Sequence, residues 1–268
     1  MKGGSGEPTR RRALARRMLL LGLICAALML TLTACGQAAA EELGVTVLGQ
    51  YPHDELAFTQ GLLLADGYLY ESTGLVGRSS LRQVDLATGD VIRLRSVPPP
   101  HFAEGLELVG NELLQLTWQT GTLFRYDLDT FELVGEQRYQ GEGWGLCYDG
   151  AALWMTDGSA TLFKRDPDTF AVLSSVQVML DGKALPRLNE LECVDGKVYA
   201  NVWLTDEIVR IDPTSGRVEA LIDASPLRTL IGITDRDAVL NGIAYDPARQ
   251  VFLVTGKLWP ALFEVRFE

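Results

Sequence analysis

Beyond residue 45 the chain alternates short apolar segments with polar turns. The segments are rich in Val, Leu, Tyr and Phe with strand-like alternation, and turn signals such as Asp66-Gly67, Asp149-Gly150 and Asp195-Gly196 separate them. A helical period is confined to one or two turns around residues 227–231. The pattern therefore predicts an all-β protein.

One strand start recurs five times along this region. Each copy has a polar or aromatic residue, usually a glycine, and then an aliphatic residue. The copies are Gln60-Gly61-Leu62, Glu104-Gly105-Leu106, Trp144-Gly145-Leu146, Asn189-Glu190-Leu191 and Asn241-Gly242-Ile243, separated by 44, 40, 45 and 52 residues. Three further strands follow each of the first four copies. Four strands per repeat and five repeats predict a five-bladed β-propeller.

The strand at 45–51 is expected to complete the last blade and close the ring, which removes an open sheet edge. A β-sandwich or a pair of domains is the alternative, but neither accounts for the regular period.

In a propeller the equivalent positions of the repeats meet around the central channel. The first such ring is Gln60, Glu104, Trp144, Asn189 and Asn241. A second ring, at the end of the adjoining strand, is Thr73, Trp118, Asp157, Trp203 and Lys257. These residues differ in kind from repeat to repeat, whereas purely structural positions tend to stay alike. The two rings predict a small polar pocket with apolar walls at one mouth of the channel.

The first residues form a targeting signal rather than part of the fold. An arginine-rich start precedes an apolar run at 18–32, which is too short for a comfortable transmembrane helix. The run ends in Leu32-Thr33-Ala34-Cys35, which resembles a bacterial lipobox, so Cys35 is the expected lipidation site. A plain cleaved signal is the alternative, and a weak twin-arginine resemblance at 9–14 leaves the export route open.

We therefore expect residues 1–35 to be a lipoprotein-type signal peptide, 36–44 a tether and 45–268 the propeller. The protein is then exported and held in the bacterial cell envelope by a lipid on Cys35. The remainder after residue 35 carries 18 basic and 34 acidic residues, a formal charge of −16. An acidic body argues against nucleic-acid binding and against membrane contact other than through the anchor. We expect a monomer.

Cysteine and histidine usage predicts no metal centre. The two histidines, His53 and His101, are far apart in sequence, and no cysteine–histidine spacing typical of zinc is present. Cys147 and Cys193 both follow equivalent strand starts. Free buried thiols are the favoured interpretation of this pair, and a disulfide stays open for an exported protein.

Several segments resemble the plant-type (papaya-like) glutaminyl-peptide cyclotransferases, which also have bacterial relatives. They are Phe58-Thr59-Gln60-Gly61-Leu62, Glu71-Ser72-Thr73-Gly74, Phe102-Ala103-Glu104-Gly105-Leu106, Gly143-Trp144-Gly145-Leu146, Leu188-Asn189-Glu190-Leu191-Glu192, Asn201-Val202-Trp203, Val239-Leu240-Asn241-Gly242-Ile243-Ala244 and Thr255-Gly256-Lys257-Leu258-Trp259-Pro260. Ala103 departs from the pattern, which often has glycine there.

The resemblance implies a five-bladed propeller that converts the N-terminal glutamine of peptides or proteins to pyroglutamate and releases ammonia. It also implies that no catalytic zinc and no other cofactor takes part. The site residues carried over by the resemblance are Phe58, Gln60, Glu104, Trp118, Trp144, Asn189, Trp203 and Lys257.

The chemistry assigns roles to these side chains. Glu104, the one carboxylate in the first ring, is the candidate proton shuttle between the attacking amine and the departing ammonia. Lys257 and Asn189 are expected to act as catalytic residues that stabilise the oxyanion, with Gln60 as a further donor. The expected substrate-binding residues are Phe58, Gln60, Trp118, Trp144, Trp203 and Asn241.

Structural alternatives accompany these roles. Glu104 and Lys257 could instead form a salt bridge that plugs the channel. Gln60, Asn189 and Asn241 could satisfy backbone groups, and Asp157 fits a turn former better than a catalyst.

Other functions remain as alternatives to the cyclotransferase. A surface-anchored propeller could bind peptides or glycans without catalysis. A propeller lactonase would need a calcium cage of several carboxylates, and a glycosidase would need a carboxylate pair, for which Glu104 has only Asp157.

Overall fold

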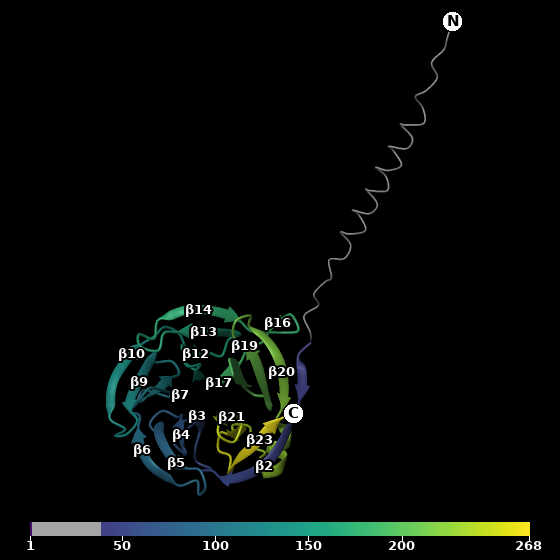
Figure 1. Ribbon diagram of the computed structural model, residues 1–268. Helices are drawn as coiled ribbons and strands as arrows, with labels where there is room; N and C mark the ends of the chain where they lie inside the picture. The colour runs from purple at the N-terminus through teal and green to yellow at the C-terminus, as the bar shows by residue number, and fades with distance from the viewer. Residues whose placement is uncertain (2–38) are drawn as a thin grey trace. The chain divides into compact units, whose positions relative to one another are not determined.

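The described part of the chain is a β-propeller, with its sheets arranged around a central axis (Figure 1). The structure, a computed structural model, describes Met1 and residues 39–268. The predicted signal segment with the lipidation site Cys35, and the first residues of the predicted tether, lie outside these residues. The remainder, Ala39–Glu268, forms one compact unit.

The described strands form five sheets, in agreement with five repeats. The first has β3 (Thr59–Ala65), β4 (Tyr68–Thr73), β5 (Ser80–Asp85) and β6 (Val91–Ser96). The second has β7 (Ala103–Val109), β8 (Glu112–Thr117), β9 (Thr122–Asp127) and β10 (Leu133–Arg138). The third has β11 (Leu146–Tyr148), β12 (Leu153–Met155), β13 (Thr161–Arg165) and β14 (Val172–Gln177).

The fourth and fifth sheets contain segments distant in sequence. The fourth has β17 (Leu188–Val194), β18 (Lys197–Val202), β19 (Glu207–Asp212) and β20 (Arg217–Asp223), with β1 (Glu41–Leu43), β15 (Met179–Leu180) and β16 (Lys183–Ala184) at its outer side. The fifth has β21 (Leu240–Asp246), β22 (Val251–Gly256), β23 (Ala261–Phe267) and β2 (Val45–Pro52). One short helix, α2 (Ser225–Ile231), follows β20 where the sequence predicted a helical turn.

The predicted closure of the ring is confirmed, but part of the predicted tether is a paired strand. Strand β2 pairs antiparallel with β23, so the start of the propeller completes its last sheet. Residues 41–43, which the sequence assigned to a tether, form β1 and pair in parallel with β20. Backbone pairing to an outer strand edge therefore begins before residue 45.

The recurring glycine is explained by close packing of successive inner strands. A Cβ on Gly61 would lie 2.4 Å from the backbone nitrogen of Leu106, and one on Gly145 would lie 2.0 Å from the carbonyl oxygen of Asn189. These distances are too short for any side chain, so the backbone itself contacts the next repeat. The fourth repeat has Glu190 in place of the glycine.

Glu190 uses its side chain to join three inner strands. Its carboxylate accepts hydrogen bonds from the backbone N–H groups of Leu62 (3.3 Å) and Ile243 (2.8 Å), which belong to β3 and β21. Burial raises the pKa of Glu190 well above its ordinary value. The role of Glu190 is structural.

A β-bulge interrupts four of the five inner strands at the recurring motif. The register shifts lie between Thr59 and Gly61, Ala103 and Leu106, Leu188 and Leu191, and Leu240 and Ile243. A bulge re-aims the side chain at that point. At these four positions the bulge interrupts the regular alternation of side chains between the two faces of the strand. In the third sheet the motif lies just before β11.

Cys147 and Cys193 form a disulfide rather than the free thiols favoured from the sequence. Their Cα atoms are 5.4 Å apart. Because the glycine motif brings β11 and β17 close together, equivalent positions on the two strands come within bonding reach. The sequence placed both residues on equivalent strands but could not give the distance between those strands.

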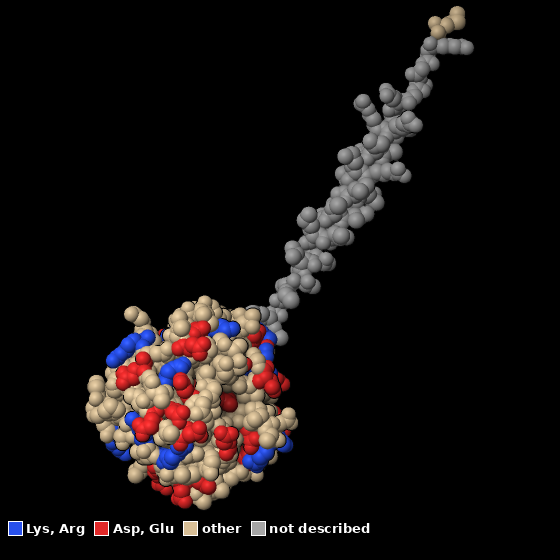
Figure 2. All heavy atoms as spheres, turned by 60° about the vertical axis from the view of Figure 1, so that its left-hand side comes forward, with Lys and Arg blue, Asp and Glu red and all other residues tan. Residues whose placement is uncertain are grey.

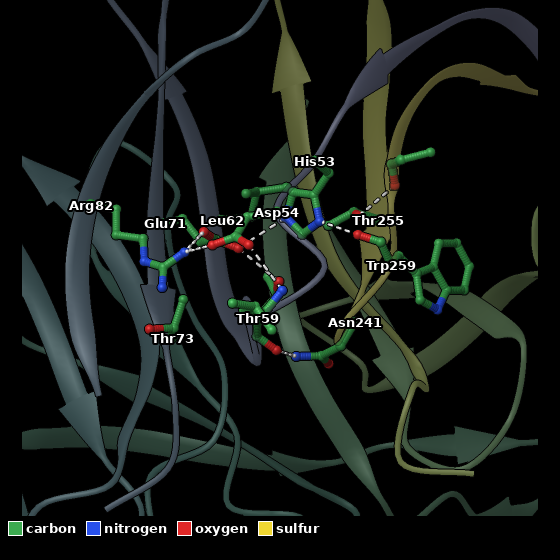
Figure 3. Close-up of polar contacts among 12 residues, drawn as sticks. His53, Asp54, Thr59, Leu62, Glu71, Thr73, Arg82, Asn241, Thr255 and Trp259 are labelled. Atoms are coloured by element: carbon green, nitrogen blue, oxygen red, sulfur yellow. Dashed lines mark hydrogen bonds and ion pairs between the residues drawn. The ribbon is translucent and has the colours of Figure 1, made fainter. Parts of the chain in front are cut away.

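Side-chain and backbone contacts fasten the closure of the ring (Figure 3). The backbone N–H of His53 donates to Pro260 O (3.1 Å), and its ring Nδ1 lies 2.7 Å from Trp259 O. A little further along, the N–H of Leu258 donates to Ala57 O (2.7 Å). The link from β2 to β3 is therefore tied to the turn between β22 and β23.

The surface carries both signs of charge. Figure 2 shows Asp and Glu side chains over the visible face, with Lys and Arg among them. Within the described residues, no helix has the length and apolar character needed to cross a membrane.

Candidate active site

A cavity of about 270 Å³ opens beside the inner strands at the ends that carry the recurring motif. Its lining is mostly aromatic with a few buried polar groups. The lining residues are Phe58, Gln60, Phe102, Glu104, Trp118, Trp144, Asn189, Trp203, Leu204, Arg236, Asp237, Val239 and Lys257. All eight residues implied by the family resemblance are among them.

Three members of the predicted rings do not line this pocket. Thr73 is buried and its hydroxyl lies 2.7 Å from Ser80 Oγ. Asp157 borders a separate cavity of about 410 Å³, and its Oδ1 accepts the backbone N–H of Ser159 (3.0 Å), as expected for a turn residue. Asn241, the third, lies behind the wall and is fully buried. Alignment of the repeats predicts which residues lie at the same level along the channel axis. It does not predict which of their side chains reach the cavity.

Glu104 is the central acidic group of the pocket. It lies in the bulge of β7 and is only 5% exposed. Its one described hydrogen bond comes from Gln60 Nε2, at 3.2 Å from Oε1. Burial raises its pKa well above the ordinary value, the charge of Lys257 opposes this, and that of Glu142 adds to it. A raised pKa makes the carboxylate a better proton acceptor than an exposed glutamate.

Lys257 supplies the positive charge of the pocket. Its side chain follows β22, is 5% exposed and places Nζ 4.8 Å from the centre of the Phe58 ring. Burial lowers its pKa to about 8, against an upward influence of Glu104. No ion pair joins Lys257 to Glu104 among the described residues, although each charge influences the pKa of the other. Both groups face the cavity.

Gln60 and Asn241 form a short relay that ends at the carboxyl group. Asn241 Nδ2 donates to the backbone oxygen of Thr59 (2.9 Å) and to Gln60 Oε1 (3.3 Å), while Gln60 Nε2 donates to Glu104. The predicted substrate-binding role of Asn241 is therefore not supported by its position. Asn241 orients Gln60 through a hydrogen bond. One amide hydrogen of Gln60 is donated to Glu104, so only the other is free to stabilise an oxyanion.

Asn189 presents a buried carboxamide oxygen without a described partner. Its side chain is 2% exposed, and no described residue hydrogen-bonds its Oδ1. A buried polar atom left unpaired costs stability unless a ligand or water satisfies it. Asn189 therefore retains hydrogen-bonding capacity for a molecule in the pocket.

Aromatic rings wall the cavity in two groups. Phe58 and Phe102 contact edge-on with ring centres 6.1 Å apart, and Phe102 contacts Trp118 at 5.7 Å. On the other side, Trp144 and Trp203 pack nearly at right angles at 5.4 Å. Such walls exclude water and strengthen the electrostatic effects of the enclosed polar groups.

Sequence reasoning missed several residues that line or support the pocket, and three of the omissions share one signal. Phe102, Glu142 and Val239 stand two positions before the recurring motif, where Phe58 stands in the first repeat. Phe102 and Val239 line the pocket, and Glu142 hydrogen-bonds two of its tryptophans. A third ring at that offset was readable from the repeat alignment. Leu204, Arg236 and Asp237 come from loops that differ between repeats and carried no such signal.

The described residues contain no cluster of three or more His, Cys, Asp or Glu side chains arranged to hold a metal ion. The buried polar groups of the pocket are one carboxyl, one ammonium and two carboxamides, and the exposed Arg236 and Asp237 add a charge of each sign to its lining. This set can move a proton and stabilise a developing negative charge.

Comparisons with known proteins show the family to which the chain belongs. The family model described as glutamine cyclotransferase matches residues 20–267. A glutaminyl-peptide cyclotransferase from Arabidopsis thaliana is 40% identical over 286 residues, covering 100% of this chain and 89% of that protein. The crystal structure of Myxococcus xanthus glutaminyl cyclase superposes with a TM-score of 0.81 at 41% identity, covering 85% of this chain and 98% of that one. The chain therefore belongs to the glutamine cyclotransferase family.

Proposed function

We propose that the pocket binds the N-terminal glutamine of a peptide or protein and closes it to pyroglutamate, with release of ammonia. Membership of the family makes the chain a glutaminyl-peptide cyclotransferase. The observation that carries the residue roles is the environment of Glu104, a buried carboxyl with a raised pKa that faces a small aromatic-walled cavity.

The reaction joins two atoms of one residue. The neutral α-amine attacks the side-chain carboxamide carbon, a C–N bond forms, and the carbonyl oxygen becomes an oxyanion. Glu104 takes a proton from the attacking nitrogen and gives it to the departing nitrogen, so that the second C–N bond breaks and ammonia leaves. Since nucleophile and electrophile share one chain, most of the acceleration comes from holding the folded-back rotamer.

Lys257 and Asn189 are proposed to stabilise the oxyanion. At neutral pH a pKa of about 8 leaves the Lys257 ammonium largely protonated, and the side-chain amide N–H₂ group of Asn189 adds a neutral donor. Fixed donors in a site sheltered from water stabilise a transition-state charge more than they would in solution. Gln60 is proposed to hold Glu104 in place, and the rings of Phe58, Trp144 and Trp203 to wall the glutamine side chain.

The test uses the full chain and a dipeptide that begins with glutamine. Release of ammonia and formation of the pyroglutamyl product, both undiminished by a chelator, are the expected results. A folded protein that binds the dipeptide without releasing ammonia would instead indicate the peptide-binding alternative.

The five sheets are proposed to be the five blades of the ring, supported by their strand order and by the five copies of the motif. A circular arrangement of four four-stranded sheets plus one augmented sheet fits this proposal.

We further propose that the protein is exported and anchored in the bacterial cell envelope by a lipid on Cys35. The sequence of residues 1–35 supports it, and so does the disulfide, because disulfides persist in oxidising compartments. The variant Cys35→Ala should move the protein from the membrane to the soluble exported fraction. An unchanged membrane fraction would contradict lipidation.

A further inference from the structure

The two aromatic groups of the pocket wall do not touch each other directly. Trp118 ends one group and Trp144 ends the other, and among the described residues no ring contact joins them. Trp118 follows β8 of the second sheet, and Trp144 precedes β11 of the third. The gap in the wall therefore falls at a boundary between two sheets.

Glu142 spans this gap. Its Oε2 accepts hydrogen bonds from Trp118 Nε1 (2.7 Å) and from Trp144 Nε1 (3.0 Å), and its Oε1 accepts one from Gln119 Nε2 (3.1 Å). An indole N–H can only donate, so both rings need an acceptor that lies between them. One carboxylate oxygen shared by two indoles fixes their orientation relative to each other.

Glu142 differs in side-chain chemistry from the residues at the equivalent position of three other repeats. In three other repeats the equivalent residue is Phe58, Phe102 or Val239, each of which contributes an apolar surface to the pocket. A charged side chain at this position contributes no apolar surface to the pocket. The compensation is its bridge between two tryptophans, which the other three residues could not make.

Glu142 also carries a charge close to the reacting groups. It is partly exposed and borders the cavity of about 410 Å³ between the second and third sheets. Partial burial opposes ionisation, but the hydrogen bonds from Trp144, Gln119 and Trp118 lower its pKa overall. The ionised carboxylate in turn raises the pKa of Glu104.

We propose that Glu142 is a positioning residue that joins the two halves of the aromatic wall and thereby fixes the shape of the glutamine pocket. It acts through Trp118 and Trp144 rather than on the reacting atoms. The inference rests on the proposed assignment of this pocket to the cyclisation.

Two substitutions separate geometry from charge. Glu142→Ala removes the acceptor and should lower kcat/KM by about ten- to a hundredfold, because small displacements of positioning groups have effects of that size. Glu142→Gln keeps an amide oxygen for both indoles, while Gln119 can turn its own amide to match. This variant should recover kcat/KM to within about threefold of the parent, a difference of less than about 1 kcal/mol.

The effect of the Glu142 charge is measured separately, from the pH dependence of kcat. In the proposed mechanism Glu104 starts ionised, so kcat falls as the pH drops below its pKa in the complex. Glu142→Gln removes a negative neighbour, lowers that pKa and should shift the acid limb of kcat to lower pH by about 0.3–1 units. The matched control is Glu136→Gln, which removes an exposed carboxylate from β10 of the same sheet and should leave both kinetics and fluorescence unchanged.

Tryptophan fluorescence tests the positioning without reference to turnover. Glu142→Ala should change the emission and increase acrylamide quenching, while Glu142→Gln and Glu136→Gln should match the parent, with melting temperatures alike in all four proteins. Parental kcat/KM in Glu142→Ala, or equal losses in the Ala and Gln variants, would overturn the proposal. Lack of ammonia release by the parent would overturn the proposed function instead, and the fluorescence comparison would still decide whether Glu142 orders the wall.

Discussion

Two glutamates, one in the first sheet and one in the second, are buried to nearly the same extent, but their pKa values are shifted in opposite directions. Glu104 on β7 is 5% exposed and Glu71 on β4 is 1% exposed. Burial raises the pKa of Glu104 well above its ordinary value. The pKa of Glu71 is lowered, because contacts with His53 and Arg82 outweigh the effect of its burial. Depth alone therefore does not decide whether a carboxyl group is charged.

The difference lies in the donors that surround each group. Glu71 Oε1 lies 3.0 Å from His53 Nε2 and accepts a 2.7 Å hydrogen bond from Thr59 Oγ1, and Arg82 Nη1 lies 3.6 Å from Oε2 (Figure 3). His53 Nδ1 faces the carbonyl oxygen of Trp259, which can only accept, so a proton on each ring nitrogen makes His53 an imidazolium. Burial opposes that charge, yet Glu71 raises the pKa of His53 overall.

Glu104 has one amide donor and an ammonium group at a distance, with a cavity on its open side. A satisfied carboxylate holds the structure together, whereas an under-satisfied one retains the ability to exchange a proton. The same residue type serves both purposes in neighbouring sheets.

Substitution of Glu104 should produce the largest effect. Glu104→Gln removes the proton carrier, and turnover should fall by about 10²–10⁴-fold, the range attributed to general acid–base groups. The melting temperature should stay the same or rise, because a poorly compensated buried carboxyl is replaced by a neutral amide. Ammonia release and thermal melting check the two parts, and retained turnover would contradict the shuttle role.

The same substitution at Glu71 should act on stability instead. Glu71→Gln leaves a buried imidazolium and Arg82 without their anion, and the free energy of unfolding should fall by about 3–5 kcal/mol. Urea unfolding measures it. The control Glu132→Gln breaks an ion pair with Arg95 in which the glutamate side chain is 73% exposed, and a change within about 0.5 kcal/mol is expected. Similar losses in both variants would refute the contrast.

The pH dependence of stability should differ in sign between the two sites. Because folding raises the pKa of Glu104, its contribution is complete below 4.5 and is lost as the pH rises from 4.5 through the folded-state pKa. Because folding lowers the pKa of Glu71, its contribution is complete above 4.5 and is lost as the pH falls from 4.5 through the folded-state pKa.

Urea unfolding of the parent and each Gln variant across acidic and neutral pH measures these slopes, which should not exceed about 1.4 kcal/mol per pH unit for each group. The parent should lose stability relative to Glu104→Gln as the pH rises above 4.5. It should lose stability relative to Glu71→Gln as the pH falls below 4.5. Slopes of the same sign would contradict the assignment.

The smallest effect is expected from Gln60. Removing its amide in Gln60→Leu takes away the described hydrogen bond to Glu104, and a bond of this kind favours the ionised form. The acid limb of kcat should therefore move to higher pH by about one unit or less. A shift to lower pH would show that Gln60 does not donate to the carboxylate.

The sequence predicted the features that depend on periodicity. The five strand starts, the closure by β2 and most of the pocket wall follow from a repeat whose copies must meet around one axis. Features that depend on the path of the backbone were not predicted. Gln60 lines the pocket while Asn241 lies behind it, although both residues lie at a register shift of an inner strand.

The close approach of β11 and β17 brings Cys147 to Cys193, a distance that alignment of repeats cannot give. Glu142 and Glu71 show a further limit. Both have obvious charges in the sequence, but their partners come from other repeats or from the link that closes the ring, so their roles appear only when those segments are placed.

The pairing of β2 with β23 sets the order of events during synthesis. Phe58 follows β2, near the start of the propeller, and Lys257 precedes β23, its last strand, yet Lys257 Nζ lies over the Phe58 ring. A ribosome-bound chain that lacks residues 261–267 has no partner for β2. The last residues of the propeller to be synthesised are therefore the ones that close the ring in which the pocket lies.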